Sequence, residues 1–594
     1  MFEPDYEANA RFYDEHVGKL TCEQSAVLAA VQRAVLNPQE PHRCFFVDGP
    51  GGTGKSFLMK TLAAWANSSP DTSGLCAAFQ GIVAQMYQHG VTLHRGFALP
   101  LDTEFGSGNA ATSSVQAGSA HGNRLSSFKL FIIDEISMVH STYFTLIDNC
   151  LRNVTGRDMP FGGAVVLCGG DMRQLSAVVP GGSHMDTVAA SVISNSLWAN
   201  FGTFRLTIPQ RDRRDPEWSA AVLAIGSGLA PRFGSDKAPM EQTSGRASSK
   251  AHYIVVPDRV RVFQAPEDAT AWLYDGVQPE GTQYTENGRS PASRRAMLCP
   301  HNATVDAFNE QILRSPLLHF DDDAHDAGIV RLMASEQREQ EDDAPEVRWN
   351  RTHDVSEDFM AKLTNPGVPN HVLELRVGCI VMVMRNLCAK YGIMNGVKLR
   401  VERISRFLIV AKTLCSAQRT VLLPRITFNM SVPSSAVRIV RRQFPIRLAY
   451  AMTTNKSQGQ TLARVCYDLR QPVFTHGACY VGLGRVEEAE DLALLLGEDA
   501  QGPDGRWYIL NIVYTELVQA LFHDVHTPVP GRPLSAPFSS GSIPRVRVLG
   551  AVPRAVHPAP RGGEPQSRAV PVTVVPSGLD SGLTVSTTEC IGLP

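Results

Sequence analysis

One glycine-rich octapeptide leaves this chain few possible folds. It follows the apolar run Cys44–Val47 and precedes a helical pattern over Phe57–Ala66. In the spacing G-x-x-x-x-G-K-[ST], glycines let backbone N–H groups surround a phosphate, and the following helix N-terminus favours its negative charge. The octapeptide consists of Gly49, Pro50, Gly51, Gly52, Thr53, Gly54, Lys55 and Ser56. An ordinary glycine-rich turn is the alternative, but the flanking strand and helix favour a P-loop in an α/β fold.

Two acidic residues supply the chemistry that a P-loop needs. A second buried strand, residues 130–133, ends at Asp134 and Glu135. Lys55 would contact the β- and γ-phosphates of a nucleotide, while Ser56 and Asp134 would hold Mg²⁺. Glu135 is then placed to accept a proton from the attacking water. Such a pair alone could be a solvated strand end, but beside a P-loop it predicts NTP hydrolysis.

The first part of the chain repeats strand, loop and helix from about Leu20 to Leu229. A third apolar strand, residues 164–169, precedes Asp171 and Gln174. Gln174 would sense the γ-phosphate or position the attacking water. The repetition predicts a parallel sheet covered by helices.

Length and composition exclude several classes of protein. The 594 residues indicate roughly four domains of about 150 residues each. A hydrophobic content of 43% fits a globular protein, and a formal net charge of −2 does not by itself indicate nucleic-acid binding. No cysteine pair has zinc-site spacing, no apolar run is long enough to span a membrane, and the N-terminus is acidic. We therefore expect a soluble, intracellular protein.

The later part of the chain changes pattern several times. An α/β unit begins at residues 295–313, and dense alternation over Leu373–Phe428 predicts a small antiparallel, barrel-like β module. The basic stretch Val437–Arg447 would suit a nucleic-acid path, or it is a solvated face. Residues 231–251 are typical of a surface loop, and the sequence after about His526 is typical of a disordered tail.

A dense polar cluster interrupts apolar sequence within Leu448–Leu462. Gly459 permits the close approach of a ligand, and the charge of Lys456 would make phosphate binding sensitive to salt. Five side chains of the cluster can bond phosphate oxygens, namely Asn455, Lys456, Ser457, Gln458 and Thr461. The alternative is a capped helix start with a solvated face.

Several motifs occur together in the order of one known family. They are DGPGGTGKS, IIDEISMV, GGDMRQLSAVVPGG, FPIRLAYAMTTNKSQGQTL and PVFTHGACYVGLGRV. From about Leu20 to Val518 the chain resembles the petite-integration-frequency (Pif-type) DNA helicases of superfamily one. The segment VGCIVMVMRNLCAKYGIMNGVKLRV resembles the branch found with Helitron-type transposons.

The resemblance implies an α/β fold with two tandem RecA-like P-loop motor domains and a small SH3-like β insertion in the second. The first motor domain would span 1–210, with the P-loop and the Asp-Glu motif. The second would span 211–372, with surface loops, and 436–525, with the DNA-coupling and arginine-finger motifs. The insertion would span 373–435, and a disordered Pro/Ser/Arg-rich tail would span 526–594.

The resemblance also assigns roles at the nucleotide. Gln24 matches a glutamine that reads adenine, and Arg485 matches an arginine that reaches the γ-phosphate from the second motor domain. Arg211 matches a second such arginine, although Arg213 and Arg214 are equal alternatives and the loop could simply be solvated. For Gln24, an ordinary position on a helix surface is the competing interpretation.

Two regions would face DNA in a protein that resembles this family. The polar cluster would contact single-stranded DNA while its neighbours face ATP, which places Gly459 near the nucleotide. His94 matches a motif on the DNA-facing side of the first motor domain, and a satisfied surface histidine is the alternative.

Four departures from the family pattern stand near these motifs. Gly482 and Gly484 replace the usual alanine and serine, and would loosen the aim of Arg485. Gln80 replaces a small hydroxyl residue, and Pro209–Gln210 replaces Asn-Met. These changes leave the ATP-binding motifs intact but would affect coupling to DNA.

We therefore expect an ATP-dependent DNA helicase that uses ATP and Mg²⁺ on single-stranded DNA and duplex junctions. Only the resemblance implies 5′-to-3′ movement and a role in DNA repair, recombination, telomere or genome maintenance, or a Helitron-derived context. We expect a monomer in the nucleus, with the mitochondrion as the alternative. The alternatives in function are a transposon-derived protein that binds ATP and DNA without unwinding, and an RNA-directed ATPase. None of the 17 histidines forms a His-x-His pair, so nicking-joining chemistry of that kind is not expected.

Overall fold

A computed structural model describes most of the chain. The described residues are 5–100, 112–179, 181–210, 214–231, 251–275, 294–315, 328–339, 360–361, 363–365, 367–388, 391–414, 418–431 and 438–519. Arg211, the predicted tail at 526–594 and most of the predicted loop at 231–251 lie outside these ranges. Within them, no helix has the length and apolar character needed to cross a membrane.

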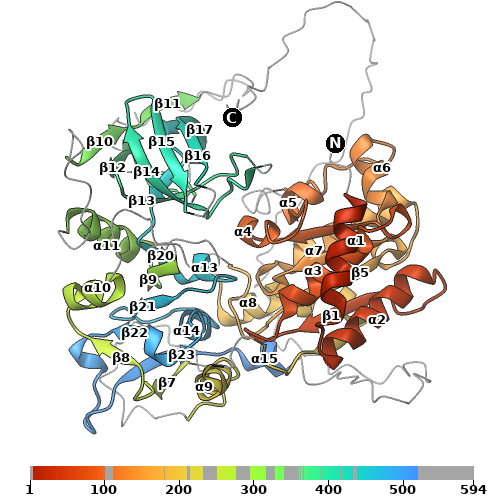
Figure 1. The fold of residues 1–594 in the computed structure, drawn as a ribbon, viewed down its shortest axis with the longest axis horizontal. Coiled ribbons are helices and arrows are strands. Elements are labelled where there is room, and N and C mark those ends of the chain that lie inside the picture. The colour runs from red at the N-terminus through yellow and green to blue at the C-terminus, as the bar shows by residue number, and fades with distance from the viewer. Residues whose placement is uncertain are drawn as a thin grey trace, which may run out of the picture. The chain divides into compact units, whose positions relative to one another are not determined.

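Six parallel strands form the first sheet, in the order β3-β2-β4-β5-β1-β6. The strands are β1 (Cys44–Asp48), β2 (Gly74–Ala78), β3 (Val91–Thr92), β4 (Leu130–Asp134), β5 (Val165–Gly170) and β6 (Phe201–Arg205). The helices are α1 (Tyr6–Val17), α2 (Cys22–Leu36), α3 (Lys55–Ala66), α4 (Gly81–Ala84), α5 (Leu93–Gly96), α6 (Ala120–Ser127), α7 (Ser141–Thr155) and α8 (His184–Ala190), coloured red to gold in Figure 1. The parallel sheet predicted from the strand–loop–helix repeat is confirmed.

Alternate residues of the central strand β4 pack into two separate cores. Leu130 and Ile132 lie in one core with residues of α2 and α3, whereas Phe131 and Ile133 lie in the other with residues of α7. Helices therefore cover both faces of the sheet, which explains why its strands are uninterrupted apolar runs. The same arrangement brings the carboxyl ends of β1, β4 and β5 to one edge, where ligands bind in open α/β sheets.

A second parallel sheet has the strand order β20-β9-β21-β22-β8. Its strands are β8 (Arg261–Phe263), β9 (Arg295–Cys299), β20 (Ala451–Thr453), β21 (Arg464–Asp468) and β22 (Leu492–Leu495). The helices in this part of the chain are α9 (Pro216–Gly226), α10 (Pro266–Tyr274), α11 (Asn302–Arg314), α13 (Thr454–Ser457), α14 (Ala478–Leu483) and α15 (Thr515–Gln519). The strands β7 (Ala251–Val255) and β23 (Tyr508–Ile512) form a separate antiparallel pair in the same part of the chain.

Antiparallel strands lie between β9 and β20 in the chain, and Figure 1 shows most of them gathered in one green group. One sheet has the order β16-β15-β14-β13-β19, and smaller sheets have the orders β11-β18-β17 and β10-β12. The strands are β10 (Val330–Met333), β11 (Ser335–Glu339), β12 (Val372–Leu375), β13 (Ile380–Val383), β14 (Lys398–Ile404), β15 (Leu408–Thr413), β16 (Thr420–Pro424), β17 (Ile426–Ser431), β18 (Arg438–Gln443) and β19 (Ile446–Leu448). Strands β10, β18 and β19 thus pair with strands at 372–431, and β11 pairs with β18.

The basic stretch in β18 contains an arginine with a structural role. Arg441 is 1% exposed, and its Nε donates to Oε1 of Glu336 at 2.5 Å. Its Nη atoms donate to the carbonyls of Met360, Leu363 and Pro369 at 2.7–3.0 Å. A buried charge with all these partners is engaged within the fold, so Arg441 does not contribute to a nucleic-acid path.

Candidate active site

The P-loop runs from the end of β1 into the first turn of α3. Gly54 precedes the helix with a φ of 81°, a left-handed conformation that glycine adopts without strain. A Cβ atom there would lie 2.6 Å from Nε2 of Gln24 and 3.2 Å from Cγ of Gln210. The backbone N–H of Gln210 donates to the Gly52 carbonyl at 2.8 Å. The departure from the family pattern at Gln210 therefore lies against the loop itself.

Lys55 is buried between the two acidic residues predicted to act with it. Its Nζ lies 3.2 Å from Oδ1 of Asp134 and 3.3 Å from Oε1 of Glu135. Burial alone would lower the pKa of Lys55, but the charges of Asp134, Glu135 and Asp171 outweigh burial and raise this pKa. Lys55 is therefore a cation at any physiological pH.

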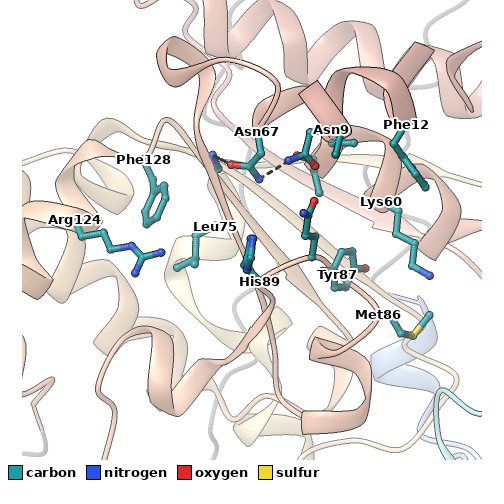
Figure 2. A pocket seen from close by; sticks show the side chains of 15 residues that line it. Asn9, Phe12, Lys60, Asn67, Leu75, Met86, Tyr87, His89, Arg124 and Phe128 are labelled. Carbon is teal, nitrogen blue, oxygen red and sulfur yellow. Dashed lines mark hydrogen bonds between the residues drawn. The ribbon is translucent and has the colours of Figure 1, made fainter. Parts of the chain in front are cut away.

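Asp134 is held by a tyrosine that no sequence motif indicates. Its Oδ2 accepts a hydrogen bond of 2.6 Å from the Tyr87 hydroxyl, and its Oδ1 accepts the Glu135 N–H at 2.9 Å. Tyr87 lines a cavity of about 390 Å³. Figure 2 shows Tyr87 there, with Lys60 and Arg124 at two sides of the cavity. Local sequence does not reveal Tyr87, because it contacts a residue 47 positions away.

Replacing Tyr87 by phenylalanine is expected to weaken magnesium-dependent ATP hydrolysis. Asp134 would lose its shortest hydrogen bond, and groups that orient a metal ligand change metal affinity or activity by about 10- to 100-fold. A titration of ATP hydrolysis with Mg²⁺ should shift to higher Mg²⁺ by about tenfold or more. Tyr13→Phe is the matched control, because the Tyr13 hydroxyl accepts from Gln32 instead. An unchanged Mg²⁺ dependence in Tyr87→Phe would contradict this role.

Three charges are buried together at the ends of β1 and β5. Arg173 Nη1 lies 2.8 Å from Oδ1 of Asp171 and 3.0 Å from Oδ1 of Asp48. Burial raises the pKa of Asp48, and the charge of Arg173 opposes that effect. The loop that carries Gln174 is thereby fixed to the strand that leads into the P-loop.

Two amide side chains at this edge have an unused acceptor. Gln174 Nε2 lies 3.4 Å from Oδ2 of Asp171, and Gln458 Nε2 lies 3.1 Å from Oε2 of Glu135. Within the described ranges, the buried Oε1 atoms of both glutamines lack a hydrogen-bond partner. Buried polar atoms of this kind are normally satisfied, so the site suits a polar ligand or a positioned water. The hydroxyl of Ser56 and the carboxylate of Asp134 are oxygen donors of the kind that Mg²⁺ prefers.

A tyrosine from α14 joins the second sheet to the P-loop. The Tyr480 hydroxyl donates to Oδ2 of Asp171 at 2.6 Å and accepts the Gly51 N–H at 3.3 Å. Nearby, Nε2 of His476 bonds the Met172 carbonyl at 2.8 Å, and burial lowers the pKa of His476 to about 4. The motif PVFTHGACYVGLGRV contains Tyr480, but no local pattern in it indicates a role for this tyrosine.

The polar cluster presents two different sides. Asn455, Lys456 and Thr461 are partly exposed, whereas Ser457 and Gln458 are buried and bond protein atoms. Burial and then the nearby charge of Arg447 lower the pKa of Lys456 to about 8. The prediction that Gln458 bonds DNA is therefore not supported by its contacts, which reach Glu135.

Arg485 follows α14 and contacts the polar cluster. Its Nε donates to the Val481 carbonyl at 2.7 Å, and its Nη1 donates to the carbonyls of Ser457 at 3.3 Å and Gln460 at 3.1 Å. A reach from Arg485 to a γ-phosphate stays a prediction.

Gly482 makes room for a large neighbour. A Cβ atom on it would lie 2.1 Å from Cε1 of Tyr467, a buried ring whose hydroxyl lies 3.1 Å from Oγ1 of Thr454. The expectation of slack at Gly482 is therefore wrong, because the ring of Tyr467 occupies the space of the missing side chain.

Gly482→Ala restores the usual family residue, yet it is expected to destabilise the protein by about 1–3 kcal/mol through overpacking. The free energy of unfolding in urea measures the effect. Gly484→Ala is the control and should cost less, since its Cβ would meet the Tyr480 carbonyl oxygen at 3.0 Å and Val222 at 3.4 Å. Equal stability of Gly482→Ala and the parent chain would contradict the packing argument.

The remaining predicted site residues, Gln24, His94 and Arg211, differ in what the structure shows of their contacts. Gln24 is buried, and its Nε2 donates to the Thr53 carbonyl at 3.1 Å, so its amide is bonded to the P-loop backbone. His94 Nε2 lies 3.1 Å from the Tyr143 hydroxyl in the first motor region. Arg211 is outside the described residues, so its predicted role stays a prediction.

Two protein-family models match segments of this chain. Residues 19–228 match the PIF1-like helicase, and residues 358–404 match the 2B domain of DNA helicase Pif1. Over these two segments the chain is similar to PIF1-like helicases. Neither match bears on the Helitron branch, which stays a prediction.

Curated relatives of the same family align over most of the chain. It is 26% identical over 475 residues to the ATP-dependent DNA helicase PIF1 of Xenopus laevis and 27% identical over 482 residues to that of Homo sapiens. Each alignment covers 79% of this chain, but only 61% and 60% of the respective relative. The chain thus spans about three fifths of the length of these relatives.

Solved structures share the fold. A Bacteroides Pif1 bound to ssDNA has a TM-score of 0.53 at 22% identity, covering 80% of this chain and 92% of that one. The Pif1 helicase from Candida albicans has a TM-score of 0.53 at 21% identity, covering 84% and 98%. The predicted fold of two tandem RecA-like motor domains is confirmed.

Proposed function

We propose that the chain is an ATP-dependent DNA helicase, in which ATP hydrolysis drives 5′-to-3′ movement along single-stranded DNA and unwinding of duplexes. One contact carries the proposal. Gln458 of the polar cluster lies 3.1 Å from Glu135, which is itself 3.3 Å from Lys55 of the P-loop. The segment proposed for DNA therefore touches the residues proposed for ATP hydrolysis. The family and the PIF1 names of the curated relatives support the same function.

ATP would bind at the carboxyl edge of the first sheet. The P-loop amides and Lys55 would hold its phosphates, Ser56 and Asp134 would hold Mg²⁺, and Glu135 would accept the proton of the attacking water. Gln174, whose Oε1 atom has no partner among the described residues, would orient that water. The other nucleotide contacts would come from Gln24, Gly459, Arg211 and Arg485.

DNA would bind along the exposed side of the polar cluster. Asn455, Lys456 and Thr461 would contact its phosphates, with His94 on the first motor domain. The proposed domains are motor domains at 1–210 and at 211–372 with 436–525, an SH3-like insertion at 373–435 and a tail at 526–594. The protein would act as a monomer on single strands and duplex junctions, in DNA repair, recombination or telomere maintenance or in a Helitron-derived context, in the nucleus or the mitochondrion.

Steady-state ATP hydrolysis, with and without a dT oligonucleotide, tests the proposal. We expect DNA to stimulate hydrolysis, and we expect a duplex with a 5′ single-stranded tail to be unwound faster than one with a 3′ tail. An RNA oligonucleotide of equal length separates a DNA-directed from an RNA-directed motor. Hydrolysis that is indifferent to DNA would contradict the proposal, and stimulation without unwinding would favour the transposon-derived alternative.

A further inference from the structure

Both carboxylate oxygens of Glu135 have a partner. Oε1 lies 3.3 Å from Nζ of Lys55, and Oε2 lies 3.1 Å from Nε2 of Gln458. The backbone of Glu135 has a φ of 55° and a ψ of 48°, a conformation that non-glycine residues rarely adopt outside functional sites. A general base must turn a lone pair toward the attacking water, and these two contacts direct the carboxylate elsewhere.

Gln458 belongs to a segment that Arg485 and the helix α4 contact. The guanidinium of Arg485 binds the carbonyls on both sides of it, at Ser457 and Gln460. Gly459 follows with a φ of 75°, and a Cβ atom there would lie 3.1 Å from Cγ2 of Val83 in α4. Gln458 is 0% exposed, whereas Asn455 and Lys456, on the preceding turn, are partly exposed. A ligand on the exposed side would therefore move Gln458 only by moving the whole segment.

We propose that Gln458 is a positioning residue that restrains Glu135, and that single-stranded DNA on the exposed side of the polar cluster releases it. The inference rests on the proposed function and adds its regulation. Lys55 would leave Oε1 for the phosphates when ATP binds, and Gln458 would leave Oε2 when DNA binds. Hydrolysis then requires both ligands, and no separate signal is needed to couple them.

Gln458→Leu tests the restraint, because leucine is an apolar residue that fills much of the buried space of glutamine and donates no hydrogen bond. We expect hydrolysis without DNA to rise about tenfold, the effect of losing one hydrogen bond to a charged group. Stimulation by a dT oligonucleotide should fall correspondingly, while the affinity for a fluorescent dT oligonucleotide, measured by anisotropy, should stay within about twofold. Damage to the fold would not raise the rate without DNA.

Two further variants complete the design. Gln458→Asn is one methylene shorter, should not reach Glu135, and should act like Gln458→Leu even if the leucine variant fails to fold. Gln501→Leu is the control, since Gln501 bonds the Gly505 carbonyl in an exposed turn and should leave hydrolysis unchanged.

Four results would overturn the inference. Lower hydrolysis of the Gln458 variants under all conditions would make Gln458 a catalytic residue, and weaker DNA binding with an unchanged rate without DNA would make it a DNA contact. If DNA stimulates hydrolysis by the parent chain and the Gln458 variants behave like the parent, the inference is wrong but the proposed function stands. A parent chain that DNA does not stimulate overturns the proposed function as well.

Discussion

Lys55→Ala is expected to lower ATP hydrolysis by roughly 10³-fold or more. A positioned cation that stabilises transferring phosphoryl charge accounts for effects of this size. The structure adds a second reason. In the parent chain, Nζ of Lys55 lies 3.2 Å from Oδ1 of Asp134 and 3.3 Å from Oε1 of Glu135. Without this ammonium group, the two buried carboxylates would lose the cation that they share. Steady-state hydrolysis with saturating dT oligonucleotide and Mg²⁺ measures the loss.

Lys60→Ala is the matched control for this variant. Lys60 lies on the same helix, α3, and lines the cavity of Figure 2. Its replacement should leave hydrolysis within about twofold, because Lys60 lies outside the motifs proposed to bind ATP and Mg²⁺. Substantial hydrolysis by Lys55→Ala would mean that ATP is bound and cleaved elsewhere, and the assigned site would be wrong.

Arg173→Met is expected to lower the free energy of unfolding by about 3–5 kcal/mol, which is what breaking a buried ion pair costs. Methionine keeps an apolar stem in place of the Cβ-to-Nε part of arginine but leaves Asp48 and Asp171 buried without their shared cation. Denaturation in urea, followed by circular dichroism, measures the change.

The pH dependence of this loss distinguishes charge from packing. Removing Arg173 raises the folded-state pKa of Asp48 further above the unfolded value, so the destabilisation is present at neutral pH and shrinks as acid protonates Asp48. Arg33→Met, on the exposed side of α2, should change stability by less than about 0.5 kcal/mol at either pH. A loss for Arg173→Met that is equal at neutral and acidic pH would point to packing alone.

Local patterns in the sequence were sufficient for the fold and for much of the site. Apolar runs that end in acidic residues predicted β1, β4 and β5, because a strand buried on both faces leaves no polar position along its length. The glycine spacing predicted the P-loop, because the backbone conformation at Gly54 excludes a side chain. These features depend on neighbours in the chain, so one sequence can show them.

Tertiary structure alone decided which side chains meet. Tyr87 reaches Asp134, Tyr480 reaches Asp171 and Gln458 reaches Glu135 across 47, 309 and 323 positions. The sequence predicted Gln458 as a DNA contact because its residue type and neighbours suit phosphate, yet its side chain is buried against the candidate general base. A hydrogen bond depends on distance in space, and a chain of two packed sheets brings together residues that no local pattern relates.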